Sequence, residues 1–273
     1  AEQSGTRIQI PPDKRNTGPA AVRMPPEIGE VLPFRYEEIE SAEEIDAGAV
    51  RQISVHYPFD DTASAFESSN NTLTAVWNLC KYSVKATSFC GVYVDGDRER
   101  IPYEGDAYIN QLCHYCVDRE YTLARYTHEY LIQNPTWPTE WQLHSVMMAW
   151  ADYIYTGETA SLETFYKDLC TKTLIDLARK DGLISTESKA CTRDFEKRLH
   201  LHKDNYIFPN GLKDLVDWPP GSFTEGGTGE RDNHEMLPVN TVVNAFHCRA
   251  MELMSRMAGV LGKRKDETRF SKQ

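Results

Sequence analysis

The residues best suited to chemistry lie in one stretch, DGDRERIPYEGD, which runs from Asp95 to Asp106. Its twelve residues include five carboxylates and two arginines. Pro102 and Gly105 interrupt helices and strands, so we expect a loop. A solvated charged loop is the simplest interpretation. Against it, the stretch also holds Ile101 and Tyr103, and it lies between two segments that look buried, TSFCGVYV and AYINQLCHYC.

Glycoside cleavage is a reaction that such a loop could perform. It needs one carboxyl group to protonate the leaving oxygen and a second carboxylate to activate water or attack directly. We assign Glu99 as the candidate proton donor, whose pKa must be raised by burial or by the neighbouring aspartates. Arg98 and Arg100 would favour the ionised form. The hypothesis therefore requires their guanidinium groups to point away from Glu99 or to be engaged by other carboxylates.

Three tryptophans outside the helical patterns could complete a sugar site. Trp137, Trp141 and Trp218 lie in or beside segments that contain proline. Sugars present C–H faces that stack on aromatic rings, whereas carboxylates and arginines bind their hydroxyl groups. The alternative is that these rings hold the loops against the core, and the residues alone do not choose between the two.

Other motifs point to no second chemistry. Cys113 and Cys116 have CxxC spacing, but no second ligand pair for zinc is visible and a redox dithiol would need a βαβ context. We interpret them as core cysteines of a helix. His200 and His202 fit a polar surface stretch. The sequence has no P-loop, dinucleotide fingerprint or GxSxG elbow, so we predict neither a metal site nor a cofactor.

Composition and charge narrow the class of partner. The chain has 273 residues, 40% of them hydrophobic, and a formal net charge of −11. Such a balance disfavours nucleic acid and anionic membranes and suits a neutral substrate. Seven cysteines in a chain this long and apolar do not indicate a disulfide framework. The N-terminal AEQSGTRIQI has no signal peptide and resembles a cut within a longer chain. The compartment stays open, with a periplasmic or secreted location favoured.

The elements around the loop divide the chain in two. Residues 1–58 are rich in β-branched and aromatic residues between prolines and glycines, which predicts strands and a linker from a preceding β-domain. From residue 59 the apolar residues recur at helical spacing, without βαβ alternation, which predicts a helical-hairpin array. We expect an irregular segment over 181–236 and a frayed tail after Leu261. The expected helices cover about 70–84, from 107, near 119–131, 140–155, 161–179 and 238–261.

The sequence resembles the α-L-rhamnosidases of glycoside hydrolase family 78. The loop motif VDGDRERIPYEGDAY carries the resemblance, and other matches follow in the same order over about residues 33–262. These matches are PFRYEEIE, WNLCKYSVKATSF, Trp141 with Trp150 and TGE, VDWPPG and NTVVNAF. The resemblance implies the first part of an (α/α)6 barrel over 59–273, preceded by a few strands of an adjoining β-sandwich. It also implies inverting hydrolysis of terminal α-L-rhamnosides, so the expected partner is a rhamnose-containing oligosaccharide or glycoside.

The resemblance assigns roles to particular positions. Glu99 would be the general acid. The expected substrate-binding residues are Asp95, Arg100, Tyr103, Asp106, Trp141 and Trp218, although many members have a longer segment between the first aspartate and the acid. Tyr103 stands where many members have tryptophan.

The resemblance also implies a missing part. A barrel of this family has twelve helices, of which the sequence predicts about half, and its general base lies in the later half. We therefore expect the isolated chain to lack the base, and its exposed apolar helix faces to favour self-association or a remainder of the chain. Two alternatives stay open: a non-catalytic carbohydrate-binding helical module, and an (α/α)6 glycosidase for another sugar.

Overall fold

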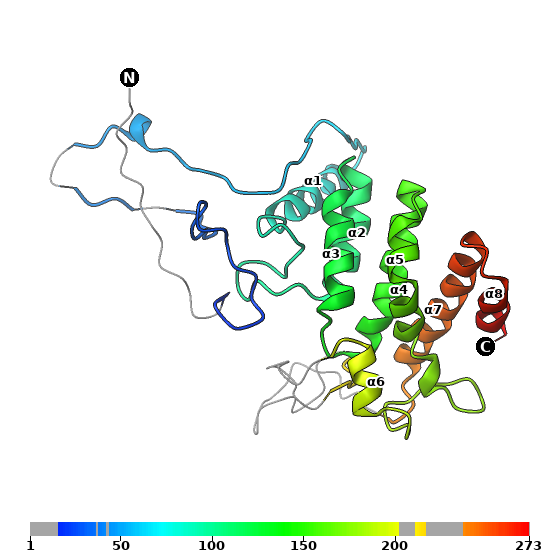
Figure 1. The fold of residues 1–273 in the computed structure, drawn as a ribbon. Coiled ribbons are helices and arrows are strands. Elements are labelled where there is room, and N and C mark those ends of the chain that lie inside the picture. Colours follow the sequence, from blue (N-terminus) through cyan, green and yellow to red (C-terminus); the bar gives the residue numbers. More distant parts are fainter. Residues whose placement is uncertain (1–15, 37, 42–43, 202–210, 217–236, 273) are drawn as a thin grey trace.

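The computed structural model describes residues 16–36, 38–41, 44–201, 211–216 and 237–272. These residues form eight α-helices and two short 3-10 helices, Ala47–Ala49 and Ile175–Leu177 (Figure 1). The α-helices are α1 (Asn71–Ala86), α2 (Glu104–Val117), α3 (Thr122–Gln133), α4 (Thr139–Thr156), α5 (Ala160–Lys172), α6 (Arg193–Arg198), α7 (Thr241–Val260) and α8 (Arg264–Ser271). The predicted mainly helical fold is confirmed.

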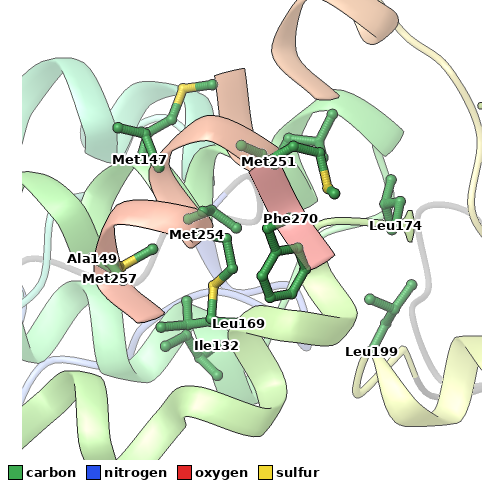
Figure 2. Close-up of a cluster of buried hydrophobic side chains, with 14 of the residues drawn as sticks. Ile132, Met147, Ala149, Leu169, Leu174, Leu199, Met251, Met254, Met257 and Phe270 are labelled. Carbon is green, nitrogen blue, oxygen red and sulfur yellow. The ribbon is translucent and has the colours of Figure 1, made fainter. Parts of the chain in front are cut away.

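Helix α4 lies at the centre of the helical body. It packs against α2, α3, α5 and α7 (Figure 1), and most of its side chains are buried, including those of Leu143, Val146 and Met148. A helix that is apolar on nearly every side has to be surrounded by other elements. On the α7 side, Met147 joins a cluster with Met254 and Met257 (Figure 2). The methionines of this last long helix belong to the core.

Local sequence signals explain where several helices begin and end. Asn70 caps α1 by accepting a hydrogen bond from the backbone N–H of Thr72 at 2.9 Å, and Asn240 caps α7 in the same way. Gly157 ends α4 in the left-handed conformation, with a φ of 71°. Helix α5 ends earlier than predicted, at Lys172, because the chain turns at Leu174 with a φ of 59°.

The strands predicted for residues 1–58 are wrong for the part of that segment that the structure describes. The described residues between 16 and 58 form turns, extended connections and the short 3-10 helix Ala47–Ala49 (Figure 1). Apolar side chains there stay open to solvent, with Tyr36 at 84% exposed and Ile53 at 74%. β-branched composition makes a strand only where a neighbouring backbone pairs with it, and the described residues supply no such neighbour.

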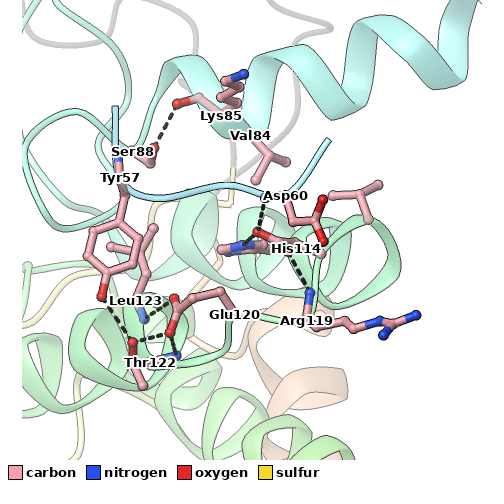
Figure 3. Close-up of polar contacts among 12 residues, drawn as sticks. Tyr57, Asp60, Val84, Lys85, Ser88, His114, Arg119, Glu120, Thr122 and Leu123 are labelled. Atoms are coloured by element: carbon pink, nitrogen blue, oxygen red, sulfur yellow. Dashed lines mark hydrogen bonds and ion pairs between the residues drawn. The ribbon is translucent and has the colours of Figure 1, made fainter. Parts of the chain in front are cut away.

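Residues 57–64 fasten this segment to the helices. The backbone N–H of Tyr57 donates to Ser88 Oγ at 3.1 Å, and the Tyr57 hydroxyl lies 3.0 Å from Thr122 Oγ1 (Figure 3). Lys81, a buried residue of α1, donates through Nζ to the carbonyl oxygen of Asp61 at 2.6 Å. These bonds join the start of the helical body to α1, α3 and the turn after α1.

The tail expected to fray is instead helix α8. Its Phe270 is 1% exposed and packs into the cluster shared by α5 and α7 (Figure 2). The Tyr166 hydroxyl donates to Asp266 at 3.0 Å, which adds a polar contact between α5 and α8. A single buried aromatic residue thus anchors a segment whose charged composition indicated disorder.

Among the described residues, no helix combines the length and the apolar character needed to cross a bilayer. All seven cysteines are free thiols. Cys113 and Cys116 lie on α2, as predicted, but only Cys113 is partly buried and Cys116 is exposed.

Candidate active site

The acidic loop is a closed turn between a buried segment and α2. Val94, directly before it, is 1% exposed, and the backbone N–H of Asp95 donates to the carbonyl oxygen of Ile101 at 3.2 Å. Inside the turn, the N–H of Arg100 donates to the carbonyl oxygen of Gly96 at 3.3 Å. Helix α2 begins at Glu104, so Gly105 lies in a helix rather than in the predicted loop.

Arg100 is directed into the protein, not toward a substrate. Its side chain is 2% exposed, and its guanidinium group donates to Asp97 Oδ1 at 2.7 Å and to Glu30 Oε2 at 2.8 Å. A further bond at 2.7 Å goes to the carbonyl oxygen of Val31. This arrangement contradicts the expectation that Arg100 binds substrate, because its buried guanidinium group is already bound by partly buried carboxylates of the N-terminal segment and of the loop.

Glu99 lies on the outer side of the loop with its carboxylate accessible. Its side chain is 35% exposed, and its Oε2 accepts a hydrogen bond from the Tyr103 hydroxyl at 2.7 Å. Arg98 Nη2 lies 3.0 Å from Glu99 Oε1 and is itself 71% exposed. The condition set by the sequence is thus met for Arg100 and not for Arg98.

Two aspartates lie near Glu99. Burial, and then the charge of Glu99, raise the pKa of Asp95 to about 6, although Arg98 opposes the shift from 3.7 Å. Asp106 reaches the surface from the first turn of α2, where desolvation and the charge of Glu99 raise its pKa. The site therefore contains two aspartates with raised pKa values, a kind of perturbation that is frequent in catalytic sites.

An aromatic wall stands beside Glu99. The ring of Tyr103 lies 5.3 Å from that of Trp141, centroid to centroid, at an angle of 59°. Trp141 comes from the first turn of α4, and it packs so closely on Gly105 that a Cβ atom there would lie 3.0 Å from its Nε1. Tyr103 and Trp141, predicted separately from the sequence, are thus neighbours. Trp137 is 3% exposed and belongs to the core, whereas Trp218 lies outside the described residues.

The start of α4 also holds a segment from much later in the chain. Glu140 accepts hydrogen bonds from the backbone N–H groups of Leu215 and Val216, at 3.3 and 2.7 Å. Pro138 and Lys213 form an isolated parallel bridge next to them. Burial raises the pKa of Glu140, which is 3% exposed. The sequence analysis did not identify Glu140, although its place in the first turn of an apolar helix fits a carboxylate that binds backbone N–H groups.

A second buried carboxylate, Glu104, also escaped the sequence analysis. It is fully buried and accepts hydrogen bonds from Thr136. Burial raises its pKa, although the charge of Lys172 opposes this shift. One signal was present in the sequence: Lys172 follows Leu169 by three residues on the apolar face of its helix, where a charge needs a buried partner. Within the described part of the chain, no cluster of three or more His, Cys, Asp or Glu side chains could hold a metal ion.

Comparison with protein families identifies the chain. Residues 61–273 match the model of the bacterial alpha-L-rhamnosidase six-hairpin glycosidase domain. The chain belongs to this family. A solved structure, the family GH78 rhamnosidase of Bacillus sp. GL1, has a similar fold, with a TM-score of 0.56 and 18% sequence identity. The match covers 79% of this chain and 20% of that one, so the chain spans about a fifth of that rhamnosidase. No curated protein matches the sequence.

As a member of a six-hairpin glycosidase family, the protein is glycoside hydrolase-like, and a glycoside is the substrate class that its family implies. The eight described α-helices agree with the helical fold of this family. The roles of Glu99 and its neighbours rest on their geometry.

Proposed function

We propose that the chain is the part of an inverting α-L-rhamnosidase that carries the proton donor, with Glu99 as general acid. The observation that carries the proposal is the contact of Glu99, through the Tyr103 hydroxyl at 2.7 Å, with a ring that packs on Trp141. An accessible carboxyl group beside an aromatic wall can protonate a glycosidic oxygen while the sugar lies against the rings.

The neighbouring residues take supporting roles in this proposal. Asp95 and Asp106 bind sugar hydroxyl groups and keep negative charge near Glu99, which favours its protonated form. Tyr103 and Trp141 line the apolar face of the sugar. Arg98 swings away when substrate binds, since a group 71% exposed loses little by moving. The general base lies outside residues 1–273, so the 273-residue chain alone turns over no rhamnoside.

Two assays test the assignment. Hydrolysis of an aryl α-L-rhamnoside is measured for the natural full-length polypeptide that contains these residues and for its Glu99→Gln variant. With an aryl group that leaves poorly without protonation, such as phenyl, we expect Glu99→Gln to lower turnover by about 10²- to 10⁴-fold, while rhamnoside binding, measured by calorimetry, is retained. The matched control is Glu163→Gln, the same change at an exposed glutamate of α5, which should leave turnover intact. Unchanged activity of Glu99→Gln, or robust hydrolysis by the 273-residue chain alone, would contradict the proposal.

One observation favours a second candidate function, a non-catalytic carbohydrate-binding helical module. Arg98 lies 3.0 Å from Glu99, and such a contact stabilises the carboxylate rather than the protonated acid. In that case the loop recognises sugar hydroxyl groups only, and neither the full-length wild type nor Glu99→Gln would hydrolyse any glycoside. A panel of aryl glycosides in the same assay separates this outcome from a glycosidase that acts on another sugar.

A further inference from the structure

Four buried polar residues, two of them sequence neighbours of Tyr103 and Trp141, form one hydrogen-bonded series. At one end, the Nζ of Lys172, at the last position of α5, donates to Gln142 Oε1 at 2.8 Å. Gln142, on α4, donates in turn through Nε2 to the carbonyl oxygen of Thr136. At the other end, the backbone N–H of Thr136 donates to Glu104 Oε1 at 3.0 Å, and the Thr136 hydroxyl donates to the second oxygen. These hydrogen bonds therefore link α5, α4, the loop before α4 and α2.

This hydrogen-bonded series of side chains is unusual because it is buried. Lys172, Gln142 and Glu104 are all 0% exposed, and Thr136 is 9% exposed. A buried ammonium or carboxylate group is costly unless hydrogen bonds and an opposite charge compensate it, so both ends depend on the links between them. A continuous series of hydrogen bonds of this kind holds its members in a single geometry.

Two of these four residues, Glu104 and Gln142, are sequence neighbours of the aromatic wall. Glu104 lies between Tyr103 and Gly105, and Gln142 directly follows Trp141. The wall depends on the distance between the first turns of α2 and α4, because Trp141 packs against Gly105 with no room for a Cβ atom. The hydrogen-bonded series spans these same two turns, so it sets the distance between them that the wall requires.

We propose that Lys172, Gln142, Thr136 and Glu104 are a positioning network that holds Tyr103 and Trp141 together as the sugar-binding wall. This inference rests on the proposed function for its purpose, since the wall is useful only if a sugar binds there. Lys172 is the key positioning residue, because its charge compensates Glu104 from the far side of α4. The network touches no reacting atom.

The electrostatics of the network make it sensitive to alkaline pH. Burial lowers the pKa of Lys172 to about 8, against the opposing effects of Glu104 on α2 and Asp168 on its own helix. His128 on α3 also faces Lys172, and burial lowers its pKa to about 3, so it stays neutral near pH 8. As the pH rises through about 8, Lys172 loses its proton and Glu104 loses its compensating charge.

A titration without ligand tests the network independently of the enzyme function. The fluorescence of the 273-residue chain is recorded between pH 6.5 and 9.5, and that of its Trp141→Phe variant is subtracted to isolate the Trp141 signal. We expect this signal to change with a midpoint near pH 8. In the double variant Lys172→Met/Glu104→Gln, which removes both charges together and leaves neither uncompensated, the change should be lost. A flat signal in wild type, or an unchanged response in the double variant, would overturn the proposal.

A second measurement separates positioning from simple structural support. In the full-length polypeptide, the double variant should raise KM for an aryl α-L-rhamnoside by about tenfold, with a smaller change in kcat, because the wall is displaced while Glu99 is intact. A lower melting temperature with unchanged KM would contradict the positioning role. If wild type neither binds nor hydrolyses rhamnosides, the proposed function fails, while the Trp141 titration still decides whether the network positions the wall.

Discussion

Glu99 and Glu104 are five residues apart in one acidic stretch, yet the structure places them in opposite environments. Glu99 is 35% exposed and contacts the exposed Arg98, whereas Glu104 is fully buried and bonded to Thr136. The two arginines divide in the same way, since Arg100 is 2% exposed between two carboxylates. Arg100 and Glu104 thus belong to the scaffold, whereas Arg98 and Glu99 remain accessible to a ligand.

The comparison teaches that composition alone does not identify working charges. A cluster of five carboxylates indicated a site, but two of them, Asp97 and Glu104, are committed to internal partners. The groups free to bind a ligand are those whose hydrogen bonds the fold has not already used. The following substitutions test this division, beginning with the largest expected effect.

The largest effect is expected at Glu99 and depends on the leaving group of the substrate. With an alkyl α-L-rhamnoside, which needs a proton donor, Glu99→Gln in the full-length polypeptide should lower kcat by about 10²- to 10⁴-fold. With a dinitrophenyl rhamnoside, whose leaving group departs without protonation, the loss should be much smaller. An equal loss on both substrates would mean that Glu99 serves binding rather than proton transfer.

The two arginines should differ strongly in their effect on stability. Arg100→Met leaves Asp97 and Glu30 without their partner, so the free energy of unfolding should fall by about 3–5 kcal/mol. Arg98→Met, the same change two residues earlier on an exposed side chain, should alter it by less than about 0.5 kcal/mol. Urea denaturation measures both variants. Similar losses in both variants would mean that the buried Arg100 and the exposed Arg98 do not differ in structural role.

Gly105→Ala tests how closely the wall is packed. The new Cβ atom would lie 3.0 Å from Trp141 Nε1, so the indole ring has to move, at a cost of about 1–2 kcal/mol in the free energy of unfolding. Adding Trp141→Phe removes the obstructing atom and should recover most of this loss. If Gly105→Ala is fully stable and the Trp141 fluorescence is unchanged, the contact between α2 and α4 is looser than the structure indicates.

The smallest effect concerns the protonation of Asp95. Its pKa is raised to about 6, so the folded state binds a proton that the unfolded state releases near pH 4. The free energy of unfolding should therefore fall as the pH rises from about 4 to about 6, by about 1 kcal/mol because the group is partly solvated. Asp95→Asn should remove this slope. Asp194→Asn, at a side chain 89% exposed, should keep it.

Periodicity predicted the long helices well and their surroundings poorly. The helix expected at 140–155 is Thr139–Thr156, and the one expected at 238–261 is Thr241–Val260. These helices have long apolar patterns with clear ends at Gly157 and Asn240. The segment 1–58 lacked such a constraint, and its β-rich composition wrongly predicted strands for the residues that the structure describes there. The tail was wrong because one buried residue, Phe270, outweighs its charged neighbours.

The candidate site was also only partly predictable. Glu99, Asp95, Tyr103, Asp106 and Trp141 were named from the sequence, and the structure brings Tyr103 and Trp141 into contact beside Glu99. Arg100 was misassigned because its partners, Glu30 and Val31, lie about 70 residues away and no local pattern connects them.

By itself, the sequence determined the helical class, the extent of the main helices and the stretch that holds the candidate acid, because these depend on residue types and spacings within one segment. Only the tertiary structure decided which charges are consumed and which remain available. Whether a carboxylate is buried or exposed depends on the segments that pack around it. Glu30 and Thr136 bind the acidic stretch directly from distant parts of the chain, and Gln142 and Lys172 are linked to it through Thr136.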